Sequence, residues 1–272
     1  MAKFQRISSK QASIYGGPGR LLVAPYGMAR PEKLSDIIDL TTYEAKNGWR
    51  DVGATNDGIA VSRGFDTDDI EVDQSTEPVD QVITGFSSSL STKLAEPTID
   101  NRQLTWIGSQ ITDVPPVLGE PTTTLSNPVA AGATVLTVAA VTGFTDNGYL
   151  KLGDEVKKIA AVDAANTKIT LKDPLTADHE AGAEVSPVTE LGYKKMSYGA
   201  PSEVPAFMVA LLSLKKDGTL YGIVFYNCKV SGDDSETTFE KGQRLLPLQM
   251  NAHTVDDLPE DQNVMIEFEQ VI

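Results

Sequence analysis

The pattern of apolar and polar residues between positions 58 and 95 has a period of two. Four short segments carry it, separated by short breaks: GIAVSRGF, DDIEVDQ, DQVITG and FSSSLSTKLA. A period of two is typical of antiparallel strands that bury one face and expose the other. The sequence therefore predicts four short, half-buried strands here, with an apolar face on a core and a polar face away from it.

The polar face of these strands combines carboxylates with small hydroxyl side chains. In the second segment acidic residues alternate with Ile70 and Val72, and in the fourth serines alternate with Leu90 and Leu94. The polar positions are Asp69, Glu71, Asp73, Ser87, Ser89, Ser91 and Lys93. Carboxylates that alternate along a strand splay along its face and do not converge on one substrate atom. We therefore interpret them as a solvated or channel-facing surface and not as a catalytic pair.

Further elements flank this region on both sides. GRLLVAPY (19–26) predicts a strand, and residues 27–48 predict a long loop. A short helix is expected after Pro97, since proline suits a first helical turn. The runs on either side of Asp217-Gly218 predict a hairpin. QRLLPLQMNAHTV and VMIEFEQV predict two more strands, in which Pro247 requires an edge or a bulge.

The composition changes near residue 115, after the linker-like PPVLGEP. Residues 118–189 are rich in Ala, Thr, Val and Gly, with short runs separated by turn pairs such as Asn147-Gly148. This pattern predicts five or six short strands in a compact domain. The predicted fold class is mainly β: a β-sandwich or barrel with one flanking α-helix, built from residues 1–117 and 190–272, plus a small inserted all-β domain at 118–189.

Charge and candidate chemistry favour an assembly role over an enzymatic one. The net charge of −15 disfavours binding to nucleic acid phosphates, which requires cationic contacts. Cys228 is the only cysteine, and His179 and His253 stand apart from any motif. No phosphate-binding loop, nucleophile elbow or HExxH motif is present. We expect no catalytic residue, no cofactor and no metal site.

One segment resembles a known family. AKNGWRDVGATNDGIAVSRGFDTDDIEVDQSTEPVDQVITGFSSSLSTKLAEPTIDNRQLTW (45–106) is similar to phage tail tube proteins, also called major tail proteins. A DVGATNDG segment leads into the first strand, and an acidic strand ends in Val72-Asp73-Gln74. A strand of small polar residues is then closed by Glu96 before a helix. VPAFMVALLSLKKDGTLYGIVFYNCKVSG and KGQRLLPLQM resemble the closing hairpin and strand of that family.

The resemblance implies a tail-tube-type sandwich that assembles with itself into hexameric rings, which stack into the tube of a long non-contractile tail. Four strands per subunit would contribute to an inner barrel through which genome DNA passes without specific binding. The seven polar positions named above would then face the lumen. The implied partners are a tape measure protein, a tail terminator and a distal tail or baseplate protein, with no role for a membrane. The implied location is the virion, with assembly in the host cytoplasm, since the first residues are not typical of a signal peptide.

Other functions remain open at this stage. The small domain could bind glycan or a cell surface, although Phe144 and Tyr149 are its only aromatic residues. A contractile-tail or type VI inner tube would have the same fold, but an outward domain would collide with a sheath. A hydrolase based on the acidic segment has little support.

Overall fold

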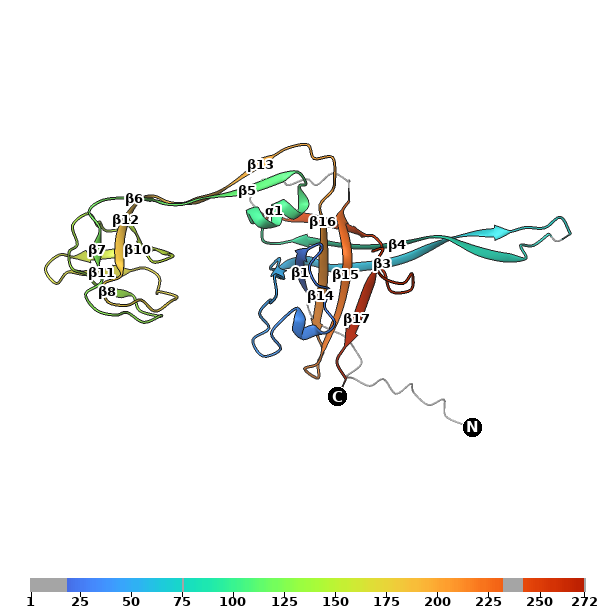
Figure 1. The fold of residues 1–272 in the computed structure, drawn as a ribbon, viewed down its shortest axis with the longest axis horizontal. Coiled ribbons are helices and arrows are strands. Elements are labelled where there is room, and N and C mark those ends of the chain that lie inside the picture. Colours follow the sequence, from blue (N-terminus) through green and yellow to red (C-terminus); the bar gives the residue numbers. More distant parts are fainter. Residues whose placement is uncertain (1–18, 75, 232–241, 272) are drawn as a thin grey trace. The chain divides into compact units, whose positions relative to one another are not determined.

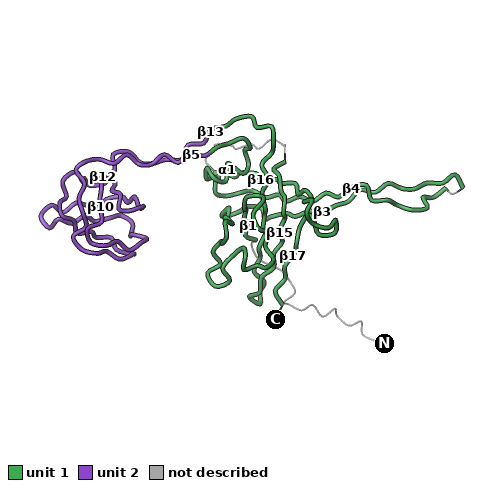
Figure 2. The backbone as a smooth tube through the Cα atoms, in the orientation of Figure 1, with its two compact units in different colours: residues 1–110, 197–272 green, residues 111–196 purple. Residues whose placement is uncertain are grey.

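The computed structural model describes residues 19–74, 76–231 and 242–271, and the chain forms two compact units (Figure 2). Unit 1 comprises Met1–Gln110 and Ser197–Ile272, and unit 2 comprises Ile111–Met196. Strands dominate both units, and the described residues contain one α-helix. The predicted mainly β fold class with one helix is therefore confirmed.

Unit 1 is built on one eight-stranded sheet (Figure 1). Its strand order is β2-β1-β14-β15-β16-β4-β3, with β17 paired to β15 beside this path. The elements are β1 Gly19–Pro25, a 3-10 turn at Leu34–Asp36, β2 Arg50–Asp51, β3 Thr55–Ile70, β4 Asp80–Leu94, α1 Ile99–Thr105, β14 Ala206–Leu214, β15 Leu220–Val230, β16 Leu246–Ala252 and β17 Met265–Glu269.

Strands β1, β14 and β15 carry buried residues on both faces, which explains their nearly continuous apolar sequences. Along β1, Leu21 and Val23 point into one hydrophobic cluster, while Leu22 and Ala24 point into a second cluster on the opposite face. The segment between β1 and β2 covers the second cluster with buried residues that include Ile37. The predicted loop therefore forms part of the core.

The first cluster is closed by the other half of the same sheet. Strand β16 pairs with β15 only at Cys228–Val230, and β4 pairs with β16. Leu248 and Leu90 from these strands belong to the same buried cluster as Phe225 of β15. Pro247 is tolerated because β16 has a neighbour on only one side at that point, so its missing N–H breaks no ladder.

The prediction of four short strands between residues 58 and 95 is wrong in the number of strands. The structure has two long strands, β3 of 16 residues and β4 of 15 residues, joined by a loop at 71–79. The weak turn signals inside the pattern, such as Gly64 and Gly85, lie within paired strands. Neither residue has a left-handed φ, and both are paired across the ladder, although a register shift directly precedes Gly85.

A buried asparagine anchors helix α1 to the sheet. Thr98 caps the helix by accepting a hydrogen bond from the Asn101 N–H. The Asn101 side chain donates to the carbonyl oxygens of Val52 and Glu96 and accepts from the Arg50 guanidinium at 2.8 Å. This side chain therefore ties the helix, the end of β2 and the end of β4 together.

Unit 2 has its own hydrophobic core, which includes Leu136, Leu150, Leu152, Ile169 and Val185. Its main sheet has the order β6-β12-β9-β10-β11-β8, with β7 paired to β12. β5 and β13, the strands in which the chain passes from one unit to the other, pair as a separate ribbon. The strands are β5 Ser109–Val114, β6 Val117–Leu118, β7 Thr123–Thr124, β8 Val135–Thr137, β9 Tyr149–Leu152, β10 Glu155–Asp163, β11 Lys168–Leu171, β12 Glu184–Glu190 and β13 Tyr193–Tyr198.

Candidate assembly surfaces

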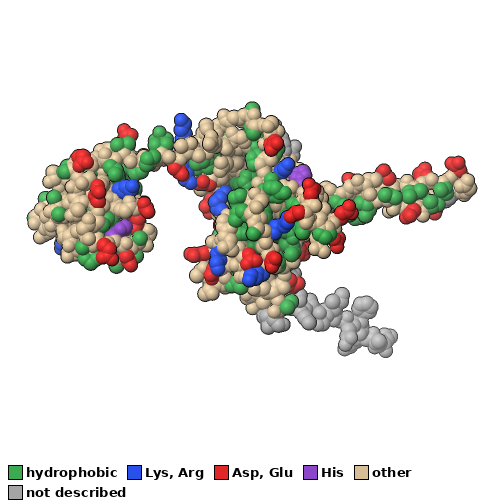
Figure 3. Space-filling model, viewed as in Figure 1, with side chains coloured by type: hydrophobic (Ala, Val, Ile, Leu, Met, Phe, Trp, Pro, Cys, Tyr) green, Lys and Arg blue, Asp and Glu red, His purple; other side chains and the backbone are tan. Residues whose placement is uncertain are grey.

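The hairpin of β3 and β4 extends beyond the body of unit 1 as a two-stranded ribbon, and we call residues 65–86 the arm (Figure 3). Phe65 and Phe86 are 62% and 63% exposed, and their ring centroids lie 6.3 Å apart. The large apolar side chains exposed on the arm are Phe65, Ile70, Val72, Val79, Val82, Ile83 and Phe86. An isolated two-stranded ribbon is marginally stable in water, and apolar patches of this kind mark interaction surfaces.

The arm is also strongly acidic. Between residues 65 and 86 the sequence has no lysine or arginine. Its acidic residues are Asp66, Asp68, Asp69, Glu71, Asp73, Glu77 and Asp80. Like charges oppose the pairing of two arms along their open edges, a common protection of edge strands. The apolar side chains of the arm therefore suit a surface other than a second arm.

The four serine and lysine positions predicted to share a face of β4 do share it. On this strand Leu90 and Leu94 are buried in the core, and Ser87, Ser89, Ser91 and Lys93 lie on the alternate face. The same face continues onto the neighbouring strands through the cross-strand partners Ala60, Ser62, Gly64, Pro247, Gln249 and Asn251. Across β3, β4 and β16 this surface, which we call the hydroxyl face, carries mainly hydroxyl and amide groups, and on β3 it continues into the arm at the carboxylate of Asp66, the partner of Gly85.

Two contacts fix side chains on the hydroxyl face. The hydroxyl oxygens of Ser62 and Ser89 lie 2.7 Å apart and share a hydrogen bond. The Lys93 ammonium donates to the Asp57 carboxylate at 2.8 Å. Asp57 and Gly58 have left-handed φ values at the bulge where β3 gains two residues relative to β4. The bulge thus brings a carboxylate to the only lysine among the seven predicted positions.

The three acidic positions do not join the hydroxyl face. Asp69 pairs with Gln81 and accepts a hydrogen bond from its side-chain amide at 2.7 Å. It lies on the same face of β3 as Phe65, opposite the hydroxyl face. Glu71 and Asp73 lie in the loop beyond the end of β3 at Ile70. The expectation that 68–74 forms a strand is wrong for these two residues. The chain reverses here to start β4, and the N–H of Val79 already bonds the carbonyl of Ile70.

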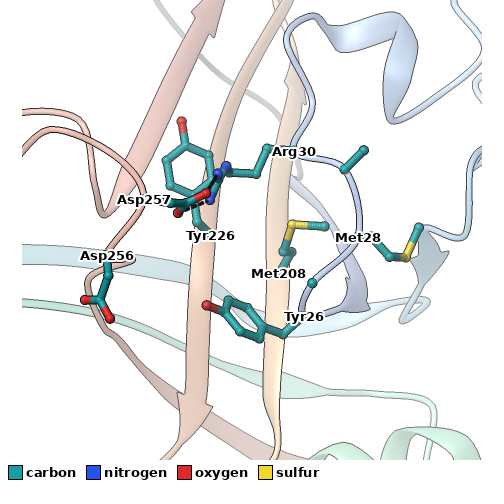
Figure 4. A pocket seen from close by; sticks show the side chains of 9 residues that line it. Tyr26, Met28, Arg30, Met208, Tyr226, Asp256 and Asp257 are labelled. Carbon is teal, nitrogen blue, oxygen red and sulfur yellow. Dashed lines mark hydrogen bonds and ion pairs between the residues drawn. The ribbon is translucent and has the colours of Figure 1, made fainter.

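Sequence reasoning missed a cleft of about 450 Å³ on unit 1 (Figure 4). The Arg30 guanidinium makes two hydrogen bonds to the Asp257 carboxylate and lies 5.6 Å from the centre of the Tyr226 ring. Met208 and Tyr26 also line the cleft. The guanidinium holds the pKa of Asp257 below its usual value. Because both charges are already paired, this arrangement stabilises the loops and offers no free nucleophile.

Glu155, His179 and Cys228 are engaged in the packing of their units. His179 Nε2 lies 3.2 Å from Glu155, whose carboxylate also accepts from the N–H of Thr176 and from Lys157. Burial acts to raise the pKa of Glu155, but these donors outweigh it and hold the pKa well below its usual value. Burial raises the pKa of the Cys228 thiol to about 12. The described part of the chain has no group of three or more metal-ligating side chains.

Comparison with known proteins gives one finding. Residues 8–115 match the family described as phage tail tube protein. No curated protein matches the chain. The matched segment contains β1, β2, β3, β4 and α1, and so includes the arm and most of the hydroxyl face. None of the helices in the described ranges has the length and apolar character needed to span a membrane.

Proposed function

We propose that this chain, whose residues 8–115 match the phage tail tube protein family, is a structural subunit that assembles with copies of itself into hexameric rings, and that the rings stack into a tail tube of the long non-contractile type. Genome DNA would pass through the central channel. The role is structural and involves no catalysis. Assembly takes place in the host cytoplasm, and the finished tube is part of the virion.

The arm is the observation that carries this proposal. In the monomer, the arm exposes four large apolar side chains by 49% to 63%, namely Phe65, Phe86, Val82 and Ile83. An exposed apolar surface of this kind indicates a contact with another molecule. The outer edge of β3 is also unpaired, since β3 is the last strand of its sheet. Closing a ring through head-to-tail contacts would pair such edges, and stacking rings would cover the arms.

We propose that the hydroxyl face lines the channel. Its serines and amides present neutral groups, Asp66 adds a carboxylate where the face meets the arm, and Lys93 is neutralised by Asp57 at 2.8 Å. DNA binds proteins through cationic contacts to phosphate, so a wall without free cations lets the duplex slide. On this proposal Ser87, Ser89, Ser91 and Lys93 face the lumen. Asp69, Glu71 and Asp73 belong to the arm and take part in contacts between copies.

We propose further that the inserted domain predicted at 118–189 lies on the tube exterior. It has its own hydrophobic core, so it can be carried as an appendage without contributing to the ring. The remaining partners are those that the resemblance to phage tail tube proteins implies. They are a tape measure protein inside, a tail terminator at one end and a distal tail or baseplate protein at the other.

Negative-stain electron microscopy of the purified protein over a range of concentrations tests the proposal. We expect sixfold rings or hollow tubes, together with a sedimentation coefficient that rises with concentration. A matched variant with Val82→Asp and Ile83→Asp keeps the core intact, because both side chains are exposed in the monomer. This variant is expected to stay monomeric. Wild-type protein that remains a folded monomer at every concentration, and in the presence of a preformed tail tip as initiator, would refute the assignment.

A further inference from the structure

A small apolar pocket of about 290 Å³ opens on unit 1 where β14 ends and β15 begins. Ile38, Leu212 and Leu220 are buried in its wall, while Tyr43 and Leu214 are 40% and 47% exposed. Arg20 and Ser213 complete the lining. The pocket therefore has a buried apolar floor and two partly exposed apolar side chains, and we call it the Tyr43 pocket.

The backbone holds Tyr43 in an unusual conformation at this pocket. Its φ of 59° is left-handed, a region that bulky residues rarely adopt. The Asp39 carboxylate accepts hydrogen bonds from the N–H groups of Thr41 and Thr42, and the Tyr43 N–H bonds the Asp39 carbonyl at 2.8 Å. Arg20 donates to the Tyr43 carbonyl. Such over-determined strain is typical of residues that clamp a ligand.

The same chain supplies side chains that fit this pocket. Phe65 pairs with Phe86, and Thr67 pairs with Ile83, so the register places both phenylalanines and Ile83 on one face of the arm. That face is continuous with the core face of β4. It carries Asp69 near the tip of the arm, and the opposite face carries Asp66 and Asp68. An aromatic ring that enters the pocket would meet leucine side chains and the Tyr43 ring, a favourable partner for it.

A second arm is a poor alternative partner for this apolar face. All seven charged residues of the arm are acidic, and their repulsion opposes arm-to-arm pairing. At the Tyr43 pocket the charged groups are instead internally paired, because Arg20 bonds the Asp51 carboxylate at 2.6 Å. Docking an apolar side chain there would bury no unpaired charge in the pocket.

We propose that the Tyr43 pocket of one copy receives Phe86 from the arm of a second copy, with Phe65 packed at the mouth. This proposal rests on the proposed assembly into stacked rings, and it identifies the surface that the arm contacts. The arm and the pocket are different surfaces of one chain, so the contact is head-to-tail. Each copy can make it once with its arm and once with its pocket. It therefore propagates from copy to copy without a symmetric dimer.

Cysteine cross-linking tests the contact in the full chain. Phe86→Cys and Leu214→Cys are combined in one variant, since the two side chains are 63% and 47% exposed in the monomer and neither belongs to the buried core. The native Cys228 is buried and does not compete. After assembly and oxidation we expect a ladder of covalent multimers on a denaturing gel. The matched control combines Ser87→Cys with Leu214→Cys, because Ser87 lies on the opposite face of β4.

The outcomes separate the two proposals. Tubes that give no ladder, or an equal ladder with the Ser87→Cys control, overturn the pocket contact and leave the tube assignment in place. A band at monomer size with altered mobility shows an intrachain contact and overturns it as well. Wild-type protein that never assembles overturns both proposals.

A second measurement checks the chemistry of the contact. Phe86→Asp is expected to raise the protein concentration needed for assembly by at least about tenfold, the ratio that corresponds to losing the burial of one aromatic side chain. Ser87→Asp, with the same added charge on the other face, is expected to change it less than about threefold. Equal effects from the two substitutions would mean that charge, and not the ring, matters at this site.

Discussion

Replacing Asn101 by alanine is expected to destabilise unit 1 more than any other single change to a polar side chain in its core. Asn101 is 1% exposed and bonds the Val52 carbonyl at 2.7 Å, the Glu96 carbonyl at 2.9 Å and the Arg50 guanidinium at 2.8 Å. Alanine removes all three bonds at once. Water cannot easily replace them, because the Asn101 side chain is enclosed between the end of β2 and helix α1.

The expected magnitude follows from the partners that are left behind. The Val52 carbonyl loses its side-chain donor, at a cost of about 1–3 kcal/mol for a buried unsatisfied group. Arg50 loses a charge-assisted bond worth about 1.5–3 kcal/mol, part of which solvent restores because Arg50 is only half-buried. The Glu96 carbonyl keeps the N–H of Thr98 as a donor. The sum is a loss of about 3 kcal/mol, or roughly 6–12 °C in Tm for a domain of this size.

Tryptophan fluorescence during chemical denaturation measures this loss in unit 1 alone, since Trp49 and Trp106 are the only tryptophans and both belong to it. The matched control is Asn251→Ala, an exposed asparagine of the same unit, expected to change stability by less than about 0.5 kcal/mol. A double-mutant cycle with Arg50→Ala is expected to give a coupling energy of at least about 1 kcal/mol. A loss below about 1 kcal/mol for Asn101→Ala, or zero coupling to Arg50, would refute the reasoning.

Three further predictions concern other parts of the chain. Gly53 has a φ of +84° and faces the Glu96 carboxylate, so Gly53→Ala is expected to lower the free energy of unfolding by about 2 kcal/mol or more. Gly27 has a similar φ and open space around it, so the control Gly27→Ala is expected to lower it by about 1 kcal/mol. Equal losses in chemical denaturation would show that the clash with Glu96 is not the cause. The lowered pKa of Glu155 means that its contribution to the stability of unit 2 is present above its ordinary pKa of 4.5 and is lost as the pH falls below that value. Hydrogen exchange of unit 2 peptides in the full chain measures this, and Glu155→Gln is expected to abolish the dependence. The thiol of Cys228, with its pKa raised to about 12, is expected to resist alkylation at pH 8 until the protein is denatured; rapid labelling of folded protein would contradict its burial.

Much of unit 1 could be predicted from sequence because its signals are local. The apolar runs on either side of Asp217-Gly218 form β14 and β15, and Gly218 takes the left-handed φ of 84° that the turn requires. Helix α1 begins two residues after Pro97. In each case the decisive interaction lies within a few residues, so composition and spacing are sufficient.

The Arg30 cleft and the Tyr43 pocket could not be predicted in the same way. Arg30 meets Asp257 across 227 residues of sequence, and no local pattern distinguishes this arginine from an exposed one. Tyr43 lies in a segment that lacks periodicity, and its left-handed backbone depends on Asp39 and on Arg20 from β1. Contacts of this kind arise only when the sheet brings distant loops together.

The faces of the arm show how one residue can decide the chemistry of a surface. At the tip Ile70 pairs with Asp80, and an unbroken register from that point would pair odd-numbered residues with odd-numbered residues, placing Asp69 on the face of Ser87. The register instead shifts between Asp66 and Thr67, where β4 contains one extra residue, Thr84. Since a shift of one residue exchanges the two faces of a strand, Asp69 lies on the face opposite the serines, and Asp66 lies on the same face as Ser87. Alternation within each strand can be read from the sequence, but the relation between the strands depends on this bulge. Gly85, the residue after the bulge, signals it only weakly, because Gly64 lies in β3 without one.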